Sequence, residues 1–419
     1  MKKLLLMGLL ASIFFSSQGE SKSLDSLREY GLGFRWDAKQ KRVEVPFELY
    51  ANLIVIPIRI NNSDTLRFLV DTGLGTTLLT DSTVFEKLGL KTLRKLTLLG
   101  LGEGEAIQAE VVIDSRLAVG KAVALHQNLI YVSSDQLNLS EFVGTHIQGV
   151  IGYELFSNLV VTIDYARQRL ILTQPHRYTY KKRKGMRFDV EISDNKPYLK
   201  AATIQSKKGP IENRLLLDSG AGHVLFLEGN EIDSTQFSYA NQMVYLGKGL
   251  NGAILGKWGR VPSFRLGPWS WLNVPTAFPQ VKAVGGNLYR PGLLGSLGGE
   301  FLHRFVVTFH YLDQYVVFKP IGRKWKRDFD LGLSGLNLRA QGPQYRNFMV
   351  EAVQAFSPAA ISGVLPGDEI WLINGLRANT LTLGEINRML RRKSGEKIEI
   401  LIRRNKLYQL IQFELRALF

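Results

Sequence analysis

Two short triplets place an aspartate directly after an apolar run and directly before a hydroxyl residue and a glycine. The first is Asp71-Thr72-Gly73, and the second is Asp218-Ser219-Gly220, 147 positions further along the chain. Two carboxyl groups held face to face cannot both ionise cheaply, so such a pair shares one proton. The ionised member can take a proton from water while the protonated member polarises a carbonyl group. If the chain brings Asp71 and Asp218 together, these residues predict hydrolysis of an amide bond.

The residues beside each aspartate suit a catalytic turn. Gly73 and Gly220 let the chain reverse with little steric cost and expose N–H donors to the carboxylates. The hydroxyl groups of Thr72 and Ser219 are placed to cross-link the two turns. One triplet alone favours an ordinary β-turn, because Asp and Gly are common turn residues. Two triplets at matching positions favour a catalytic pair.

Further landmarks recur at nearly the same separation, which indicates an internal duplication. The matching pairs are Leu99-Gly100-x-Gly102 with Leu246-Gly247-x-Gly249, Gly120 with Gly267, Gly149-Val150-Ile151-Gly152 with Gly292-Leu293-Leu294-Gly295, and Val160-Val161-Thr162 with Val306-Val307-Thr308. The last pair is 146 positions apart. A shared order of landmarks with one small change in loop length is hard to obtain by chance. Each half therefore holds one of the two candidate catalytic aspartates.

The elements that must position the aspartates are strands. Apolar segments at residues 53–60 and 66–70 flank a polar turn, and segments 199–204 and 213–217 repeat this pattern. Residues 159–163 with 170–172 predict a closing hairpin, and residues 305–318 predict its counterpart. One short helix is expected at residues 82–88, and long amphipathic helices are absent from the pattern. The fold class is therefore mainly β.

Each half resembles a retropepsin-type subunit, with Asp-[Thr/Ser]-Gly, a central glycine-rich hairpin and an apolar-apolar-Gly motif. That motif is Val150-Ile151-Gly152 in the first half and Leu293-Leu294-Gly295 in the second. The resemblance covers residues 45–320 and implies two acid-protease β-barrel lobes that form a pepsin-like pseudo-dimer. It departs from the family at Leu74-Gly75 and Ala221-Gly222, where a hydroxyl residue often bonds the catalytic carboxylate. A carboxylate that lacks this bond is expected to be less acidic.

Glycine-rich hairpins occupy the positions where the family carries flaps, which close over substrate and exclude water. The flap candidates are Gly100, Gly102 and Gly104 in the first half, and Gly247, Gly249 and Gly252 in the second. The second segment also fits G-x-G-x-x-G, but no helical pattern follows it, so a dinucleotide site is disfavoured. An ordinary mobile hairpin is the alternative for each.

The C-terminal segment resembles a PDZ domain, most specifically in the run SPAAISGVLPGDEIWLING. A helix is expected at residues 385–391 and a strand at 397–403. PDZ domains bind peptide C-termini by strand addition, and a loop of backbone N–H groups holds the carboxylate. The matching loop comprises Ser334, Gly335, Leu336, Asn337 and Leu338, with Asn337 where the family often has glycine. A domain that only packs on the protease is the alternative. With the two lobes, this combination is similar to bacterial PDZ-containing aspartyl proteases.

The N-terminus has the features of a secretory signal. Lys2 and Lys3 precede an apolar run at residues 4–15, and the small residues of Ser17-Gln18-Gly19 favour cleavage before Glu20. An uncleaved anchor is the alternative. The chain has no cysteine, which excludes disulfides and cysteine-ligated metals, so an oxidising compartment is tolerated. Export to the periplasm, the cell envelope or the medium is therefore expected.

Charge and histidine content narrow the remaining functions. The formal net charge of +16 favours anionic partners such as an envelope surface, whereas export and poor aromatic interleaving argue against nucleic acid. The six histidines show no metal-binding spacing, so neither a metal nor a cofactor is expected. His223 follows Ser219 by four residues without a nucleophile elbow, which favours a pocket or surface role.

These observations predict an exported, monomeric aspartic endopeptidase that hydrolyses peptides or proteins, with a PDZ domain that binds a C-terminal peptide or regulates access. The alternative is an inactive exported scaffold that binds peptides through the PDZ domain. The expected segments are a signal peptide at 1–19, an N-terminal segment at 20–44, lobe 1 at 45–175, a basic linker at 176–186, lobe 2 at 187–320, a linker at 321–330 and the PDZ-like domain at 331–419.

Overall fold

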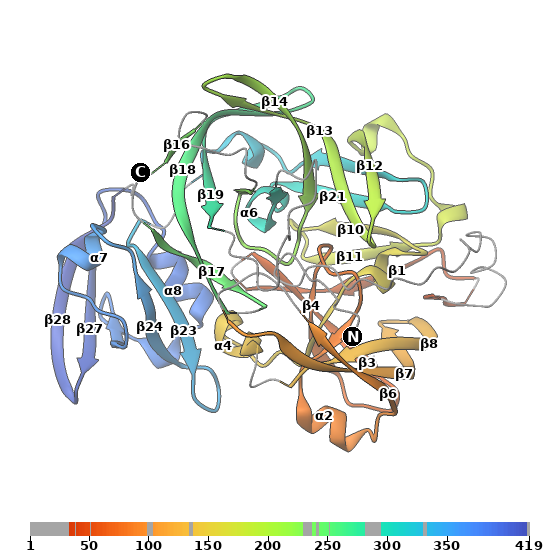
Figure 1. Cartoon of the computed structure of the whole chain (residues 1–419), viewed down its shortest axis with the longest axis horizontal. Helices are drawn as coiled ribbons and strands as arrows, with labels where there is room; N and C mark the ends of the chain where they lie inside the picture. The colour runs from red at the N-terminus through yellow and green to blue at the C-terminus, as the bar shows by residue number, and fades with distance from the viewer. Residues whose placement is uncertain are drawn as a thin grey trace.

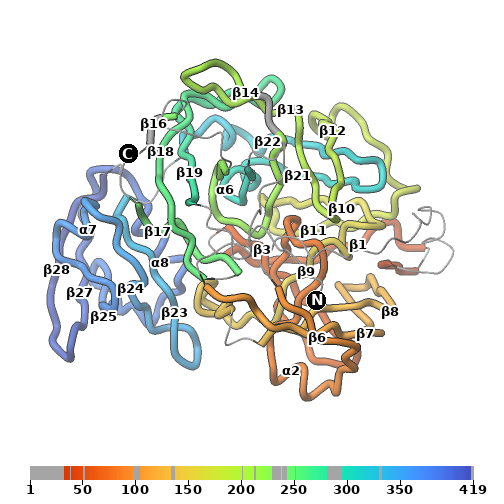
Figure 2. Tube along the Cα trace, viewed as in Figure 1, coloured from red at the N-terminus to blue at the C-terminus, as the bar shows by residue number. Residues whose placement is uncertain are grey.

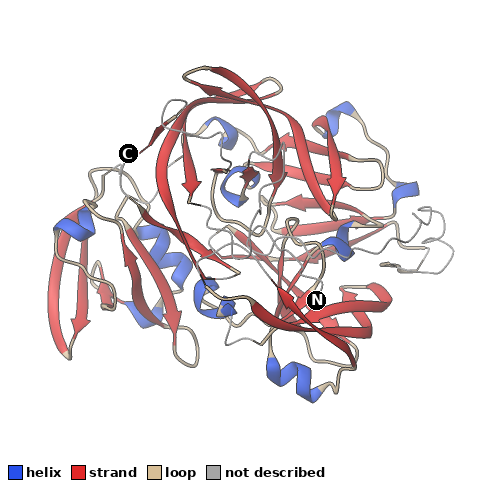
Figure 3. Ribbon diagram, in the orientation of Figure 1, coloured by secondary structure: helices blue, strands red, loops and turns tan. Residues whose placement is uncertain are grey.

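The computed structural model describes residues 33–37, 39–50, 52–98, 104–133, 137–228, 237–239, 243–250, 252–280, 295–329 and 333–416. The predicted signal segment lies outside these residues. The chain is mainly β, with two lobes side by side and a smaller C-terminal domain beside them (Figures 1 and 3). The predicted fold class is confirmed. None of the described helices is both long and apolar enough to cross a membrane.

Lobe 1 is built on an eight-stranded sheet with the order β2-β3-β4-β9-β5-β8-β7-β6. Its strands are β2 (Glu48–Tyr50), β3 (Leu53–Ile60), β4 (Leu66–Val70), β5 (Leu78–Leu79), β6 (Thr92–Leu98), β7 (Ile107–Val119), β8 (Ala122–Tyr131) and β9 (Gly149–Ile151), and its helices are α2 (Ser82–Lys87), α4 (Leu139–Val143) and α5 (Tyr153–Phe156). Strand β4 is apolar on both faces because it lies inside the lobe, between β3 and β9.

Lobe 2 repeats this plan. Its strands are β12 (Met186–Ser193), β13 (Lys196–Ser206), β14 (Gly209–Leu217), β15 (Leu225–Leu227), β16 (Ser238–Tyr239), β17 (Val244–Gly249), β18 (Gly252–Leu266), β19 (Trp269–Pro279) and β20 (Gly295–Leu297), with helix α6 (Gly299–Leu302). Strand β14 pairs antiparallel with β13 and parallel with β20, as β4 does with β3 and β9. The shared pairing shows the duplication that the sequence predicted.

A group of paired strands between the two lobes joins them (Figure 2). It contains β1 (Arg42–Pro46), β10 (Val160–Asp164), β11 (Arg169–Thr173), β21 (Phe305–His310) and β22 (Tyr315–Pro320). Strand β10 of lobe 1 pairs with β21 of lobe 2, and the hydroxyls of Thr162 and Thr308 meet at 2.8 Å. Phe156 packs edge-on against Phe309 at 5.5 Å between ring centroids. Both lobes therefore share one hydrophobic core.

Two segments expected to lie outside the lobes pack against them. Phe34 is fully buried in the common core, and β1 pairs with β11, so part of the predicted N-terminal segment packs with the lobes. Near residue 325, the Trp271 indole N–H donates to the Trp325 carbonyl, and Arg304 lies over the Phe329 ring. The turns η1 (Pro175–Arg177), η2 (Lys182–Lys184) and η3 (Lys324–Lys326) carry some of the exposed basic residues of both linkers.

The C-terminal domain has a separate core and its own sheet. Its strands are β23 (Leu336–Gln341), β24 (Asn347–Val353), β25 (Glu369–Ile373), β26 (Leu376–Arg377), β27 (Lys397–Arg404) and β28 (Leu407–Glu414), with helices α7 (Pro358–Ile361) and α8 (Leu383–Met389) and the turn η4 (Ala378–Thr380). Thr382 and Glu385 form a capping box at the start of α8, which stabilises the N-terminus of this helix.

The shared core predicts that the two lobes unfold together. We expect Phe309→Ala to lower the free energy of unfolding by about 3–5 kcal/mol, because the cavity lies in the core between the lobes. Urea denaturation followed by tryptophan fluorescence measures this loss. Leu272→Ala is the control, since Leu272 is 74% exposed on β19 and should change stability by less than about 0.5 kcal/mol. A similar small change for Phe309→Ala would contradict the shared core.

Candidate active site

Strand pairing places both predicted aspartates in the same position of their lobes. Asp71 follows β4, and Asp218 follows β14. Each backbone N–H donates at 2.9 Å to the neighbouring parallel strand, from Asp71 to the carbonyl of Ile151 and from Asp218 to that of Leu297. Each aspartate is only 1% exposed. Both carboxyl groups are therefore fixed by buried strands.

The glycines of the two triplets set the distance between the turns. The Gly73 N–H donates to Asp71 Oδ1 at 2.7 Å, and the Gly220 N–H donates to Asp218 Oδ1 at 2.9 Å. A Cβ atom at position 220 would lie 2.2 Å from Asp71 Cγ, and one at position 73 would lie 3.1 Å from Asp218 Cγ. Each glycine thus faces the aspartate of the other lobe, and a side chain at position 220 would push the carboxyl groups apart.

The second residues of the triplets cross-link the lobes. The Thr72 hydroxyl donates to the Leu217 carbonyl at 2.6 Å and accepts from the Ser219 N–H at 2.9 Å. The Ser219 hydroxyl donates to the Val70 carbonyl at 2.9 Å and accepts from the Thr72 N–H at 3.1 Å. All four hydrogen bonds are buried and run between lobes. They form the cross-link that the sequence predicted.

The closeness of the carboxyl groups changes their acidity. Burial raises the pKa of Asp71 well above its usual range, and the charge of Asp218 raises it further. Burial also raises the pKa of Asp218, against the effect of its hydrogen bond with Asp71. Two negative charges so close together in a buried site are unfavourable. The pair therefore shares one proton over the pH range between its two pKa values.

Gly75 and Gly222 stand at the positions where the family often carries a hydroxyl residue after the triplet. Leu74, which precedes Gly75, is fully buried in lobe 1, while in lobe 2 the Ala221 N–H bonds Asp218 and lowers its pKa. The hydroxyls of Thr76 and Thr77 donate instead to Glu154, at 2.8 and 2.7 Å. A backbone N–H therefore supports one aspartate, and no hydroxyl of these threonines is directed to the other.

Lys196 is a site residue that the sequence analysis missed. It is 1% exposed at the start of β13, where β3 of lobe 1 has the equally buried Leu53. The preceding Asn195 donates to the Gly75 carbonyl at 3.1 Å, which holds this turn against the catalytic loop of lobe 1. The predicted strand began at residue 199, so the lysine was not compared with its repeat partner. The signal that could have identified Lys196 is a lysine in one half at the position where the other half has a leucine.

The charge of Lys196 acts on three carboxyl groups. Burial lowers the pKa of Lys196 to about 8, and the negative charges of Asp71, Asp218 and Glu228 oppose this change. Burial raises the pKa of Glu228 to about 7, and the charge of Lys196 opposes it. Below pH 8 the catalytic pair therefore has a buried ammonium group nearby, which favours its ionised state.

The described flap candidates bring the two lobes into contact. The β17–β18 hairpin of lobe 2 carries Gly247, Gly249 and Gly252, and a Cβ atom at position 252 would lie 3.6 Å from the Gly104 nitrogen of lobe 1. Leu250, at the hairpin turn, is 2% exposed and packs in an apolar cluster of lobe 1. The two hairpins therefore meet across the lobes. Gly100 and Gly102 lie outside the described residues.

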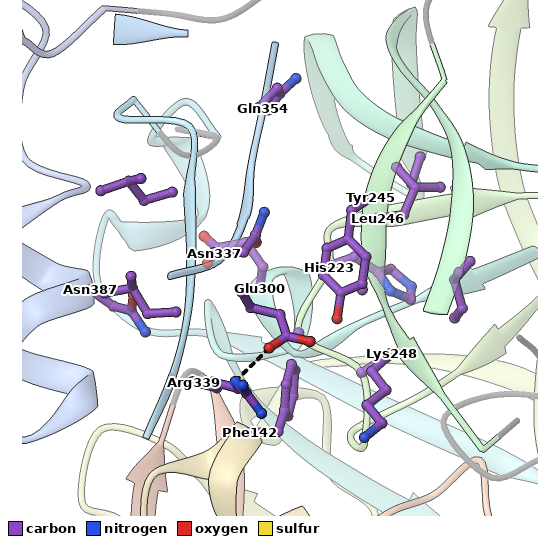
Figure 4. Close-up of a pocket in the computed structure, with 18 of the residues that line it drawn as sticks. Phe142, His223, Tyr245, Leu246, Lys248, Glu300, Asn337, Arg339, Gln354 and Asn387 are labelled. Carbon is purple, nitrogen blue, oxygen red and sulfur yellow. Dashed lines mark ion pairs between the residues drawn. The ribbon is translucent and has the colours of Figure 1, made fainter. Parts of the chain in front are cut away.

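The PDZ loop candidates and His223 line one pocket of about 280 Å³ (Figure 4). Gly335 has φ of +82°, and a Cβ atom there would lie 2.1 Å from Ser357 Cβ, so only glycine fits. Ser334 is buried, and its hydroxyl accepts from the Leu336 N–H at 3.3 Å. Asn337 and Leu338 continue into β23. His223 bonds Ser296 at 2.9 Å, and burial lowers its pKa to about 4, so it is neutral at physiological pH.

Among the described residues, no cluster of three or more His, Cys, Asp or Glu side chains could hold a metal ion.

Comparison with known families agrees with this geometry. Residues 56–155, which include Asp71, match the family model of aspartyl proteases, and residues 349–404 match that of PDZ domains. The chain therefore contains an aspartyl protease domain and a PDZ domain, the combination of a PDZ-containing aspartyl protease, which confirms the predicted resemblance. Both kinds of domain bind peptides or proteins.

Two solved structures are distantly similar. Basic 7S globulin from soybean is 11% identical, with a TM-score of 0.39 over 70% of this chain and 99% of that protein. The photosystem II D1 C-terminal processing protease is 16% identical, with a TM-score of 0.20 over 22% of this chain and 24% of that protein, so this chain spans about a quarter of its length. No curated protein matches the chain.

The cross-link between the triplets predicts a measurable loss of stability. Ser219→Ala removes one hydroxyl and leaves the Thr72 N–H and the Val70 carbonyl buried without a partner. We expect a decrease of about 2–4 kcal/mol in the free energy of unfolding, measured by urea denaturation. Ser219→Thr is the matched control because it keeps the hydroxyl and should retain most of the stability. Equal stability of Ser219→Ala and the unmodified chain would show that these bonds do not hold the lobes together.

Proposed function

We propose that this protein is an aspartic endopeptidase in which Asp71 and Asp218 activate one water molecule between them. The observation that carries the proposal is the buried pair of carboxyl groups, held in contact by four hydrogen bonds between the lobes. A pair in this state offers one basic and one acidic oxygen to a substrate at the same time. Hydrolysis of an amide needs both.

The chemistry follows from the single shared proton. The ionised carboxylate accepts a proton from water, whose oxygen attacks the peptide carbonyl, while the protonated carboxyl group donates a hydrogen bond to the carbonyl oxygen. The resulting tetrahedral species collapses when the nitrogen of the leaving group gains a proton from the pair. We also propose that the hairpin that carries Leu250, which is buried against lobe 1, acts as a flap. A closed flap removes bulk water and so strengthens these electrostatic interactions.

We also propose that the protein is exported and that it meets an anionic envelope surface. A wide groove on the sheet that joins the lobes supports this partner, since it is lined by Lys41, Arg42, Arg177, Arg183, Lys184 and Lys319. None of the described residues that line the groove is acidic. Such a concentration of positive charge attracts polyanions or anionic head groups.

Replacing either aspartate tests the proposed activity. We expect Asp71→Asn and Asp218→Asn each to lower kcat/KM for peptide hydrolysis at least about 1,000-fold, because an amide cannot transfer the proton. Purified chain is incubated with a diverse peptide pool from acidic to neutral pH, and products are measured by mass spectrometry. The control is Asp189→Asn, an exposed aspartate on β12 that should keep full activity. A folded wild-type chain without products at any pH would favour the inactive scaffold instead.

The buried lysine predicts a specific pH dependence. Lys196→Met removes a positive charge that favours ionisation of Asp71 and Asp218, so both apparent pKa values of the pair should rise. We expect the bell-shaped profile of kcat/KM to move by about one unit toward higher pH. The matched control is Lys200→Met on the same strand, whose exposed ammonium pairs with Glu191 at 2.6 Å. An unshifted profile for Lys196→Met would rule out this electrostatic role.

A further inference from the structure

Exposed apolar side chains gather on the outer edge of the PDZ domain. Most of the large apolar side chains that are exposed in the described part of the chain belong to this domain. Three of them, Leu407, Tyr408 and Leu410, lie on β28, where their exposed fractions are 74, 54 and 57%. Single exposed apolar residues are ordinary on a protein surface, but three on one strand are typical of a surface that binds a partner.

Strand β28 is an open sheet edge. It is the last strand in the order β23-β24-β25-β27-β28, and it lies on the side of the PDZ domain away from the lobes (Figure 1). Its pairing with β27 runs from Leu407 to Glu414 without a bulge. Proteins commonly protect such an edge with a proline, a bulge or a charge on its inner face, and β28 has none of these. The edge is therefore suited to pairing with a further strand.

The hairpin turn determines which backbone groups of β28 face the open side. Asn405 and Lys406 form a two-residue turn with φ of 50° and 67°, and Arg404 pairs with Leu407 across it. Hydrogen-bonded and non-hydrogen-bonded pairs alternate in an antiparallel ladder, so every second residue of β28 directs its N–H and C=O groups away from β27. These residues are Tyr408, Leu410, Gln412 and Glu414. In the described part of the chain, no other strand pairs with this side of β28.

The sequence of β28 is complementary to itself. When two copies of the strand pair antiparallel about a two-fold axis at Leu410, Tyr408 lies opposite the partner's Gln412. Lys406 then lies opposite the partner's Glu414, and these two side chains are exposed and opposite in charge. A shift of one residue in register would set side chains of opposite faces against each other, and a shift of two would remove the charge pair.

The same alignment extends an apolar row that already crosses the PDZ sheet. Leu372 of β25 lies beside Leu401 of β27, and Leu401 lies beside Leu410 of β28, on the face opposite the domain core. Pairing at Leu410 places the partner's Leu410 next in this row. A contact between two identical patches requires a patch that is complementary to itself, and β28 meets this requirement in both its charges and its apolar residues.

We propose that two copies of this chain associate through β28, with the strands antiparallel and centred on Leu410, so that the two PDZ sheets form one continuous sheet. The sequence predicted a monomer, and this proposal departs from that prediction. The lobes of each copy lie on the other side of its PDZ domain, so the contact leaves the two catalytic sites apart and does not depend on their activity (Figure 1). Because one strand edge gives a small interface, we expect a dissociation constant of about 10–100 μM.

Sedimentation velocity over a concentration range that spans this constant measures the association. We expect the mass of the unmodified chain to rise from that of one copy to that of two. Leu410→Lys places two like charges against each other at the axis and should weaken the association at least about ten-fold. The matched control is Leu272→Lys, which changes another exposed leucine on β19 of lobe 2 and should leave the association unchanged.

An exchange of charges tests the register. Lys406→Glu and Glu414→Lys each set like charges opposite one another in the dimer, so each should weaken the association several-fold. The variant that carries both changes restores opposite charges and should recover the association. Urea denaturation of every variant at low concentration checks that the PDZ domain remains folded.

Three outcomes would contradict the proposal. A chain that stays monomeric at every concentration, or a dimer that Leu410→Lys leaves unchanged, would overturn association through β28. Failure of the double charge variant to recover the association would overturn the register centred on Leu410. Binding to anionic lipid vesicles that Leu410→Lys weakens, without any self-association, would show that this edge contacts a membrane instead of a second copy.

Discussion

The site depends on holding two carboxyl groups closer together than their charges favour. Burial and mutual repulsion both oppose ionisation of Asp71 and Asp218, so the folded chain must supply the opposing free energy. It does so through hydrogen bonds between the lobes, because the hydroxyl groups of Thr72 and Ser219 each donate to a backbone carbonyl of the opposite lobe. The sheet and the core shared by the lobes prevent them from separating, and so the distance between the aspartates is a property of the whole two-lobed body.

The two halves repeat the same backbone plan but differ in the residues that surround the pair. Lobe 1 places the apolar Leu53 where lobe 2 places Lys196, and only the lobe 2 aspartate receives a hydrogen bond from an N–H of Ala221. Such differences give the two carboxyl groups unequal environments. A symmetric pair would have no fixed direction for its shared proton, whereas an asymmetric pair binds a substrate carbonyl in one preferred orientation.

Much of this arrangement could be predicted from the sequence because it depends on short-range patterns. An apolar strand followed by Asp-x-Gly specifies a buried turn, and its repetition predicted that Asp71 and Asp218 would face each other. Lys196 was missed because strand patterns take a lysine as a boundary, and its burial depends on carboxyl groups far away in the sequence. The contact of Gly144 with Leu383 and the position of α4 beside β23 also joined segments without any shared pattern. Long-range packing of this kind follows from complementary shapes, which a single sequence does not display.

The β17–β18 hairpin of lobe 2 packs on lobe 1 and lines a pocket together with the PDZ domain. Its turn residue Leu250 is buried in lobe 1, while the charge of Glu351 on β24 acts on Tyr245 near the base of the hairpin. Moving this hairpin away from lobe 1 would expose the Leu250 side chain at a cost of about 1.5–3 kcal/mol. The same hairpin contributes Lys248 to a pocket that Ser334 and Gly335 of the PDZ domain also line. A movement of this one element would therefore change its packing on lobe 1 and the shape of that pocket together.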